Sequence, residues 1–375
     1  MKKLAILLTS SGWGGLEMNI AKLSKLLMNI GWEITLITTE RAVHNNNKEG
    51  IHYSSLRTIK PTKKYLDINS ARRITKILTS SNIQILFIGY NRDIDLATLI
   101  KRLFFKSLKI VYQQHMQLGI NKKDPIHTLR YRSIDKWITP LPWLKNEIIK
   151  RTYFPKDRIE VIPLGADVDG LVQRKYSKEE ARKKLNINGS GTLIGVIGRI
   201  DPDKGQRFLI EAVIGMRAKG VDIQLLIFGS PTVNSYNSQE YYEEIVHLVN
   251  KNDMSEHIHF VGHSKNVQLF YNAVDIFTMA SKSETYGMVT IESMLSGVLV
   301  IGTNSGGTPE ILENGKLGLV YDYNNLDDYC SKVLWVLNNK KEADELAKAA
   351  KLVASSKYSQ VEEAKQIDKL LMTLN

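Results

Sequence analysis

The amino-acid sequence predicts an α/β protein built from two Rossmann-like domains in tandem. Its 375 residues are too many for one hydrophobic core, which makes two domains the expected number. Short runs rich in β-branched residues alternate with amphipathic helical patterns, as in stacked βαβ units with a parallel sheet. This alternation begins at the N-terminus and restarts near residue 190, so each half predicts a sheet of its own.

The first half contains the elements of one such domain. A strand at residues 3–9, a helix at 16–30 and a strand at 33–39 form its first βαβ unit. Further strands are expected at residues 83–88, 109–113, 136–139 and 159–162.

The second half repeats this order, with a helix at residues 206–217. Its strands are expected at residues 192–197, 223–228, 257–261, 274–278, 298–302 and 318–321. The joint falls within residues 163–177, which mix glycine, proline and charges, and we place the domains at residues 1–167 and 168–355. After a break at Ser355 and Ser356, residues 356–375 are expected to form a helix that crosses back to the first domain. Two sheets facing each other would leave a cleft at the carboxyl ends of their strands, where α/β folds bind ligands.

Cysteine usage and hydropathy indicate the compartment. The single cysteine, Cys330, excludes an intramolecular disulfide framework and is typical of a reducing cytosol. The apolar start at residues 4–8 is too short for a signal peptide and has no small-residue cleavage pattern after it. No apolar run approaches the ~18 residues that span a bilayer. We therefore expect a cytoplasmic protein.

The net charge of +12 is concentrated in the first half of the chain. Residues 1–170 hold 28 Lys and Arg against 14 Asp and Glu, a net charge of +14, and the remaining residues carry −2. Such an asymmetry indicates that the first domain faces something anionic: a membrane surface, a phosphorylated glycan or nucleic acid.

Two carboxylates separated by seven residues are the first candidate site. Glu284 lies in a polar loop that contains glycine, and Glu292 lies in the apolar helical run that follows. Desolvating an ionised carboxylate is costly, so one placed among apolar neighbours is expected to be paired or to bind something. One acid from a loop and one from the next helix can hold two parts of a hydroxyl-rich ligand, as in a sugar nucleotide.

The second candidate is a pair of cations between a strand and a helix. Gly198 and Arg199 end the strand at 192–197, and Lys204 and Gly205 precede the helix at 206–217. The amides and dipole at a helix N-terminus already favour an anion, so two cations there predict a diphosphate pocket that also stabilises a departing diphosphate. The alternative is a solvated Arg/Lys pair in a surface loop.

The glycine-rich loop at residues 10–17 follows the first strand and opens a helix. Glycines there allow a ligand to approach backbone amides. A dinucleotide fingerprint requires a third glycine where this chain has Glu17, and although Glu40 could imitate the acid that binds ribose, the missing glycine disfavours an NAD enzyme.

Two further loops follow predicted strands. His115 comes directly after the strand at 109–113 and is expected to hydrogen-bond a sugar, although a lone histidine is more often structural. The loop at residues 302–310 carries two glycines before Thr-Pro-Glu and is either a simple turn or a wall of the same pocket.

Residues 101–109 mix cations with adjacent aromatic side chains. With Arg57, Lys60, Lys63, Lys64, Arg72 and Arg73 they could form a membrane-facing surface. The alternative is that Leu103 and Phe104 face the core and the cations are solvated. No nucleic-acid-binding motif accompanies the charge, so a nucleic-acid partner is not expected.

Metal and serine-hydrolase chemistry find no motif in the sequence. The eight histidines and the cysteine form no cluster with the spacing of metal ligands, and no metal site is expected. Asp201 and Asp203 have an Asp-x-Asp spacing, but they lie between the two proposed phosphate-binding cations and are interpreted as a loop. There is also no Gly-x-Ser-x-Gly elbow.

In their order along the chain, these motifs resemble glycosyltransferase family 4, a group of retaining enzymes with the GT-B fold that use nucleotide sugars. The resemblance covers nearly the whole chain, including residues 161–167, which are similar to the family's interdomain segment. The matching elements are Gly14-Gly15-x-Glu17, Gly198-Arg199 with Lys204-Gly205, Glu284-x7-Glu292, and Ser-Gly-Gly-Thr-Pro-Glu at residues 305–310.

The resemblance implies a role for each matching residue. Arg199 and Lys204 would hold the donor diphosphate, Glu292 the ribose, and Glu284 the hydroxyls of the transferred sugar. His115 would contact that sugar from the first domain. The remaining donor-binding residues would be Gly14, Gly15, Gly198, Gly229, Tyr286, Gly287 and Met288.

The sequence thus predicts a retaining, metal-independent glycosyltransferase with a GT-B fold, peripheral on the inner face of the plasma membrane. A UDP-sugar is the expected donor, with no further cofactor. The acceptor is expected to be an anionic glycan or a lipid-linked molecule in polysaccharide or lipopolysaccharide synthesis. Two alternatives remain open: a sugar-nucleotide epimerase or hydrolase of similar architecture, distinguished by its products, and a non-catalytic membrane-surface or glycan-binding protein, which no nucleotide would stabilise.

Overall fold

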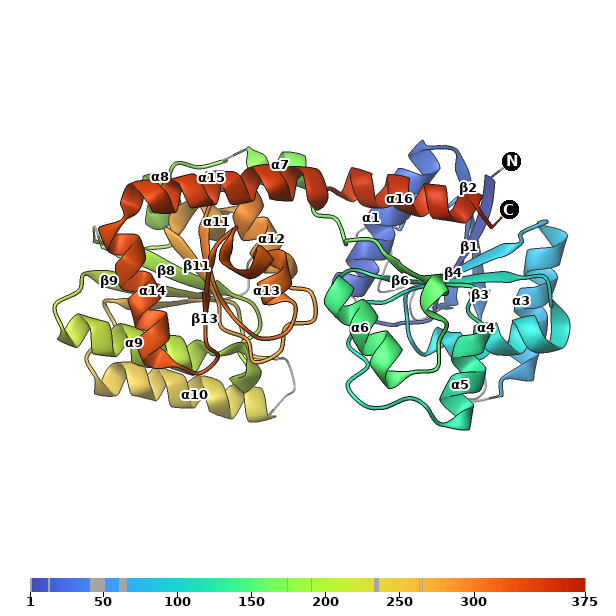
Figure 1. Ribbon diagram of the computed structural model, residues 1–375, viewed down its shortest axis with the longest axis horizontal. Helices are drawn as coiled ribbons and strands as arrows, with labels where there is room; N and C mark the ends of the chain where they lie inside the picture. Colours follow the sequence, from blue (N-terminus) through green and yellow to red (C-terminus); the bar gives the residue numbers. More distant parts are fainter. Residues whose placement is uncertain are drawn as a thin grey trace. The chain divides into compact units, whose positions relative to one another are not determined.

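A computed structural model of the chain describes residues 2–12, 14–40, 51–60, 66–173, 175–189, 191–232, 236–262, 264 and 266–374. The chain divides into two compact units (Figure 1). The N-terminal unit comprises Met1–Gly165 and Ser359–Asn375, and the C-terminal unit comprises Ala166–Tyr358. The predicted boundaries at residues 167 and 355 fall within a few residues of these.

The N-terminal unit is built on a parallel sheet that, over its described residues, has seven strands in the order β3-β2-β1-β4-β5-β6-β7. The strands are β1 (Lys2–Leu8), β2 (Trp32–Thr39), β3 (Ser55–Ile59), β4 (Ile85–Ile88), β5 (Lys109–Gln113), β6 (Lys136–Thr139) and β7 (Ile159–Val161). The helices are α1 (Gly15–Asn29), α3 (Ile68–Ser80), α4 (Asp93–Leu99), η1 (Ile100–Phe104), α5 (Pro125–Arg132), α6 (Pro142–Arg151), η2 (Lys156–Arg158) and α16 (Gln360–Met372).

The C-terminal unit contains a second parallel sheet, whose six described strands follow the order β10-β9-β8-β11-β12-β13. They are β8 (Thr192–Ile197), β9 (Ile223–Phe228), β10 (Ile258–Val261), β11 (Ile276–Met279), β12 (Leu299–Thr303) and β13 (Leu319–Tyr321). The helices are α7 (Val168–Val172), α8 (Lys178–Lys184), η3 (Pro202–Lys204), α9 (Gln206–Ala218), α10 (Tyr236–Lys251), α11 (Gln268–Ala273), α12 (Met288–Leu295), α13 (Thr308–Ile311), η4 (Glu313–Gly315), α14 (Leu326–Asn338) and α15 (Lys340–Lys357).

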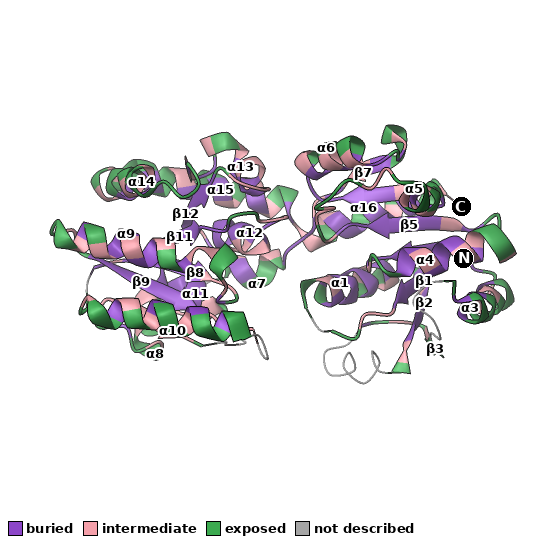
Figure 2. Cartoon of the chain, turned by 90° about the horizontal axis from the view of Figure 1, so that it is seen from below, coloured by how far each residue is buried: buried purple, intermediate pink, exposed green. Residues whose placement is uncertain are grey.

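Helices cover both faces of each sheet, so the strands are buried and the outer helix faces are exposed (Figure 2). In the N-terminal unit one core forms between the sheet and α3, α4, α5 and α6, and another between the sheet, α1 and α16. Strands buried on both faces need nearly continuous apolar sequences. This is why runs such as that of β9 could be recognised in the sequence.

The last helix, α16, belongs to the N-terminal unit although it follows the C-terminal unit in the chain. Its buried Glu363 accepts hydrogen bonds from the Gly165 amide and Gln113 Nε2, both at 2.7 Å, and from Asn19 Nδ2 at 3.3 Å. Burial raises the pKa of Glu363 to about 7. One carboxyl group thus joins α16 to α1, to β5 and to the segment that leaves β7, in addition to the apolar contacts of the helix with the sheet and α1.

The two-sheet α/β fold predicted from the sequence is confirmed, with two corrections in detail. The predicted break at Ser355 and Ser356 is wrong, because α15 continues through both serines to Lys357. Their hydroxyls donate to the carbonyls of Lys351 and Val353, at 2.8 and 3.0 Å, and so do not interrupt the helix. The prediction also lacked β3, the edge strand. Of the residues named above, Lys63 and Lys64 lie outside the described ranges.

Candidate functional site

The two predicted phosphate-binding cations lie in the loop between β8 and α9, which contains the turn η3. The Asp201 carboxylate accepts a hydrogen bond from the Asp203 amide at 3.2 Å, so these two residues form a turn, as interpreted from the sequence. Lys204 is thereby placed just before the first turn of α9, at the positive end of the helix dipole. Arg199 stands in the same loop and is exposed. This loop therefore suits an anion.

A salt bridge joins the two motifs that the sequence analysis treated separately. Lys204 Nζ lies 2.8 Å from Glu284 Oε2, and the two side chains are 29% and 21% exposed. Next to this pair, the Lys282 amide donates to the Asp203 carbonyl at 2.9 Å. The loops after β8 and β11 are therefore held together by both backbone and side chains.

The loop after β12 packs against the loop after β11, which carries Lys282 and Glu284. The Gly307 amide donates to the Glu284 carbonyl at 2.8 Å, and the Ser305 hydroxyl donates to the Lys282 carbonyl. Gly306 has a φ of +65°, and a Cβ on it would lie 2.3 Å from the Glu284 carbonyl oxygen. Only glycine permits this approach, so the second glycine-rich loop packs directly against the backbone of Glu284.

Two predicted glycines bring the ends of β8 and β9 into contact. Gly198 and Gly229 have φ values of +144° and +153°, and a Cβ on Gly229 would lie 1.8 Å from the Gly198 carbonyl oxygen. No larger residue fits at Gly229. At Gly198 and Gly229, next to the loop that carries Arg199, the carboxyl edge of the sheet therefore consists of backbone without side chains.

Glu292 is held by a tyrosine that the sequence analysis missed. The Tyr271 hydroxyl, from α11, donates to Glu292 Oε2 on α12 at 2.6 Å. Burial and the neighbouring carboxylate raise the pKa of Tyr271 above its usual range, so the hydroxyl remains a donor. Glu292 itself is half-buried, and this bond accounts for a carboxylate among apolar neighbours. No local spacing links Tyr271 to Glu292, so only the fold could reveal it.

The N-terminus of α12 lies between the two glutamates in sequence. Tyr286 is buried, Gly287 caps the helix with a φ of +79°, and Met288 is the first helical residue. These residues therefore present a helix start immediately after Glu284, a second position where the dipole favours an anion or an electronegative oxygen.

The corresponding loop of the N-terminal unit is organised by Glu17. The Gly14 amide donates to Glu17 Oε2 at 2.8 Å, the Ser10 hydroxyl donates to the other oxygen, and the side chain is buried. A carboxylate thus lies in the loop where a dinucleotide fold binds a pyrophosphate, and it accepts a hydrogen bond from the Gly14 amide. Glu40, the suggested ribose acid of that alternative, is exposed and pairs with Lys60 at 3.3 Å. The structure therefore disfavours an NAD site here.

His115 follows β5 at the carboxyl edge of the N-terminal sheet. Its ring is half-buried, and burial lowers its pKa to about 4, so the imidazole is neutral near pH 7. Among the described residues its buried Nε2 atom has no hydrogen-bond partner. A buried ring nitrogen without a partner is costly, and a hydroxyl of a ligand would satisfy it.

The predicted residues thus fall into two groups. Those of the C-terminal unit are brought together by the contacts above along the carboxyl edge of one sheet. Gly14, Gly15 and His115 belong to the N-terminal unit, at the carboxyl edge of its own sheet.

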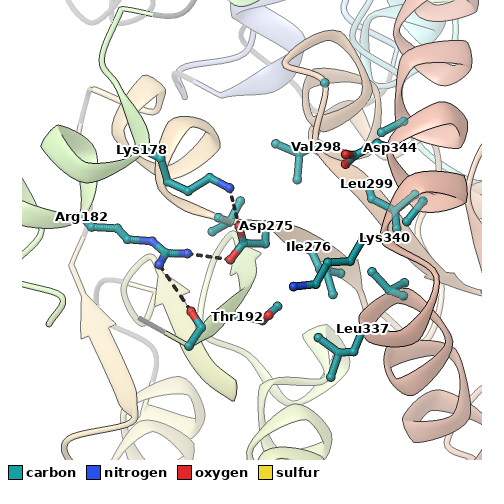
Figure 3. Close-up of a pocket in the computed structure, with 16 residues that line it drawn as sticks. Lys178, Arg182, Thr192, Asp275, Ile276, Val298, Leu299, Leu337, Lys340 and Asp344 are labelled. Atoms are coloured by element: carbon teal, nitrogen blue, oxygen red, sulfur yellow. Dashed lines mark hydrogen bonds and ion pairs between the residues drawn. The ribbon is translucent and has the colours of Figure 1, made fainter. Parts of the chain in front are cut away.

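A separate pocket of about 420 Å³ lies at the opposite edge of the C-terminal sheet (Figure 3). Its lining includes Thr192, Ile276 and Leu299, the first residues of β8, β11 and β12. The Asp275 carboxylate there is already paired with Arg182 at 2.6 Å and with a lysine of α8. It is not part of the site described above, because parallel strands present their binding loops at the carboxyl edge.

The described side chains and helices bear on the metal and membrane predictions. Within the described ranges, no three His, Cys, Asp or Glu side chains gather as a metal site would require. None of the helices in those ranges has the length and apolarity of a membrane span.

Comparison with known families gives one match for each half of the chain. The model described as "Glycosyltransferase Family 4" matches residues 13–169, and the one described as "Glycosyl transferases group 1" matches residues 177–353.

Individual relatives agree with these matches. The chain is 28% identical over 224 residues to a D-inositol 3-phosphate glycosyltransferase of Corynebacterium urealyticum, covering 58% of this chain and 52% of the relative. It is 26% identical over 223 residues to the capsular polysaccharide biosynthesis glycosyltransferase CapM of Staphylococcus aureus, covering 58% and 56%. The matches thus span little more than half the length of these relatives.

A solved structure shares the whole fold. The Anabaena protein HepE, crystallised in complex with UDP, superposes with a TM-score of 0.82 at 18% sequence identity, and all of both chains is covered.

Proposed function

Because the chain belongs to the group 1 glycosyltransferases, which act on sugar-nucleotide donors, we propose that it transfers the sugar of a UDP-sugar to an anionic glycan or lipid-linked acceptor. Transfer retains the anomeric configuration and uses neither a metal ion nor a further cofactor. The enzyme works in the cytoplasm, at the inner face of the membrane.

The observation that carries this proposal is the Lys204–Glu284 salt bridge at the start of α9. This contact, at 2.8 Å, supports the proposal that a cation for the diphosphate stands next to a carboxylate for the sugar. Glu292, oriented by Tyr271, offers a second carboxylate for the two hydroxyls of a ribose. A nucleotide sugar consists of a ribose, a diphosphate and a sugar, and each of these parts would bind one of the three side chains.

In the proposed reaction, the bond between the sugar's anomeric carbon and the diphosphate oxygen breaks, and a bond to the acceptor oxygen forms on the same face. Arg199 and Lys204 stabilise the charge that develops on the leaving diphosphate. That diphosphate accepts the proton of the acceptor hydroxyl. Neutral His115 binds a sugar hydroxyl, and Glu284 holds another, so that neither acts as a nucleophile.

UDP is the first nucleotide to test, since HepE was crystallised with it. Thermal shift with UDP-, GDP- and ADP-sugars identifies the base, and mass spectrometry of the products identifies the acceptor. We expect one nucleotide series to raise the melting temperature, and NMR of the product to show the donor's anomeric configuration. Undiminished transfer in the presence of EDTA tests the metal-independent reaction.

Alanine variants of Lys204 and Glu292 test the assigned residues. Both are expected to lose transfer, while Lys348→Ala, which removes an exposed cation of α15 in the same unit, keeps it. Unchanged transfer rates in both site variants would falsify the assignment. Free nucleotide released without an acceptor would instead favour the epimerase or hydrolase.

A further inference from the structure

Several large apolar side chains are exposed on α5 and on the segments connected to it in the N-terminal unit. Their exposed fractions run from 51% for Leu129 to 72% for Ile126. Phe104 and Phe105, which the sequence analysis considered for a membrane surface, instead pack against the core. The apolar set, which we call the α5 surface, consists of Leu103, Ile120, Ile126, Leu129 and Tyr153.

Hydrogen bonds connect the segments that carry the α5 surface. The Arg102 guanidinium donates to the Leu129 carbonyl at 3.1 Å, which joins η1 to α5. The Arg151 guanidinium donates to the Gly119 carbonyl at 3.0 Å, and the Lys122 amide donates to the Arg151 carbonyl at 2.8 Å. The loop before α5 is thereby fixed on the end of α6 (Figure 1). The five side chains thus come from one connected part of the unit.

The cations of the α5 surface outnumber its acids. Residues 116–132 hold four Lys and Arg against one acid, and residues 145–158 hold five against two. The Asp124 and Glu147 carboxylates are already bound to His127 and Arg151, and Arg130 is paired with Asp95, outside both segments. Lys123 lies 5.3 Å from the Tyr153 ring centre, which places a cation over an exposed aromatic side chain. Positive charge therefore remains for a partner.

We propose that the α5 surface docks on an anionic lipid bilayer. Apolar side chains flanked by Lys and Arg match a bilayer interface, where the former enter the acyl boundary and the latter contact anionic headgroups. An aromatic ring with a polar end favours the same depth. This inference deepens the proposed function, on which it rests for its lipid-linked acceptor, by naming the surface that brings the enzyme to that acceptor.

Cosedimentation of the full chain with vesicles tests the docking. The probes are vesicles of phosphatidylcholine alone and vesicles with phosphatidylglycerol added, without donor or acceptor. We expect binding to the anionic vesicles only, reduced by high salt. The double variant Ile126→Glu with Leu129→Glu is expected to bind at least about tenfold more weakly, since it removes two apolar groups and adds repulsion.

A matched control places the same change elsewhere. Leu352, on α15 of the C-terminal unit, is 74% exposed, and Leu352→Glu should bind vesicles like the unaltered protein. If the double variant does not fold, Lys122→Gln with Lys123→Gln, which leaves the apolar groups intact, must lower binding to the anionic vesicles. Equal binding to neutral and anionic vesicles, or full binding by the folded variants, overturns the proposal.

Thermal shift by nucleotide sugars on the same samples separates the two proposals. Stabilisation by a nucleotide without vesicle binding overturns only the docking, and vesicle binding without nucleotide stabilisation overturns only the transferase.

Discussion

The loops after β1 and β8 occupy equivalent places in their sheets, but the helices that follow them start beside side chains of opposite charge, Glu17 for α1 and Lys204 for α9. Each of these two strands lies inside its sheet: β1 lies between β2 and β4, and β8 lies between β9 and β11. At the start of α1 the Gly14 amide donates to the carboxylate of Glu17, whereas Lys204 stands at the start of α9. The same topology thus yields one helix N-terminus with an acid beside it and another with a cation, which suits a phosphate. In the proposed function, Lys204 is therefore the side chain that assigns the donor diphosphate to the C-terminal unit.

Reversing the charge at α9 breaks this comparison most directly. Lys204→Glu makes the start of α9 resemble that of α1, and we expect transfer to fall by about 10²–10³-fold because charge on the leaving diphosphate is no longer stabilised. Steady-state kinetics and nucleotide thermal shift measure the loss. Lys204→Arg keeps the charge and should retain more activity than Lys204→Glu, and equal activity of the two would contradict the assigned role.

The pH dependence of stability tests whether the His115 imidazole is neutral near pH 7, in contrast to the charged Lys204. His115 has a folded pKa of about 4 against an ordinary value of 6.5, so the unfolded chain binds its proton at a higher pH than the folded one. Its contribution to stability therefore rises from pH 4 to pH 6.5, by at most about 3 kcal/mol. His115→Asn should flatten this rise in denaturant unfolding across that range. A variant with the same pH slope as the unaltered protein would show that the ring titrates normally.

Removing the Tyr271 hydroxyl tests the proposed role of the Glu292 carboxylate in donor binding. Tyr271→Phe leaves Glu292 without the donor at 2.6 Å, and we expect donor affinity to fall by about tenfold because a hydrogen bond to a charged group is worth about 1.5 kcal/mol. Isothermal titration with the donor identified above measures it. Tyr329→Phe is a suitable comparison, since this buried tyrosine pairs with Thr278 in the same unit. Equal donor affinity in the Tyr271→Phe and Tyr329→Phe variants would contradict a role for Glu292 in donor binding.

The smallest effect is expected from a substitution of Glu17, at the start of α1. Glu17→Ala removes the acceptor of the Gly14 amide and the Ser10 hydroxyl, which should lower the free energy of unfolding by about 1 kcal/mol, as for the loss of a helix cap. Denaturant unfolding measures this change, and nucleotide affinity should stay the same. A large loss of nucleotide affinity would mean that the start of α1 takes part in donor binding.

The sequence predicted the fold wherever burial leaves a continuous apolar run. The strands β5, β6, β8 and β9 coincide with their predicted ranges because both of their faces are covered. The edge strand β3 was missed because only Ile59 of its five residues is buried, which leaves little hydrophobic pattern. The helix break at Ser355 was wrong because the serine hydroxyl bonds to the carbonyl one turn earlier, a choice that local propensity does not reveal.

For the site, the sequence alone determined the candidate residues and their chemistry. A glutamate in an apolar helix and cations before a helix point to a bound ligand on elementary physical grounds. Only the tertiary structure decided which of them meet. It placed Lys204 against Glu284, 80 positions away, and Tyr271 against Glu292. It also showed that Glu17 binds the Gly14 amide and the Ser10 hydroxyl in the loop after β1. These contacts depend on the parallel order of the strands, which gathers loops distant in sequence at one edge of a sheet.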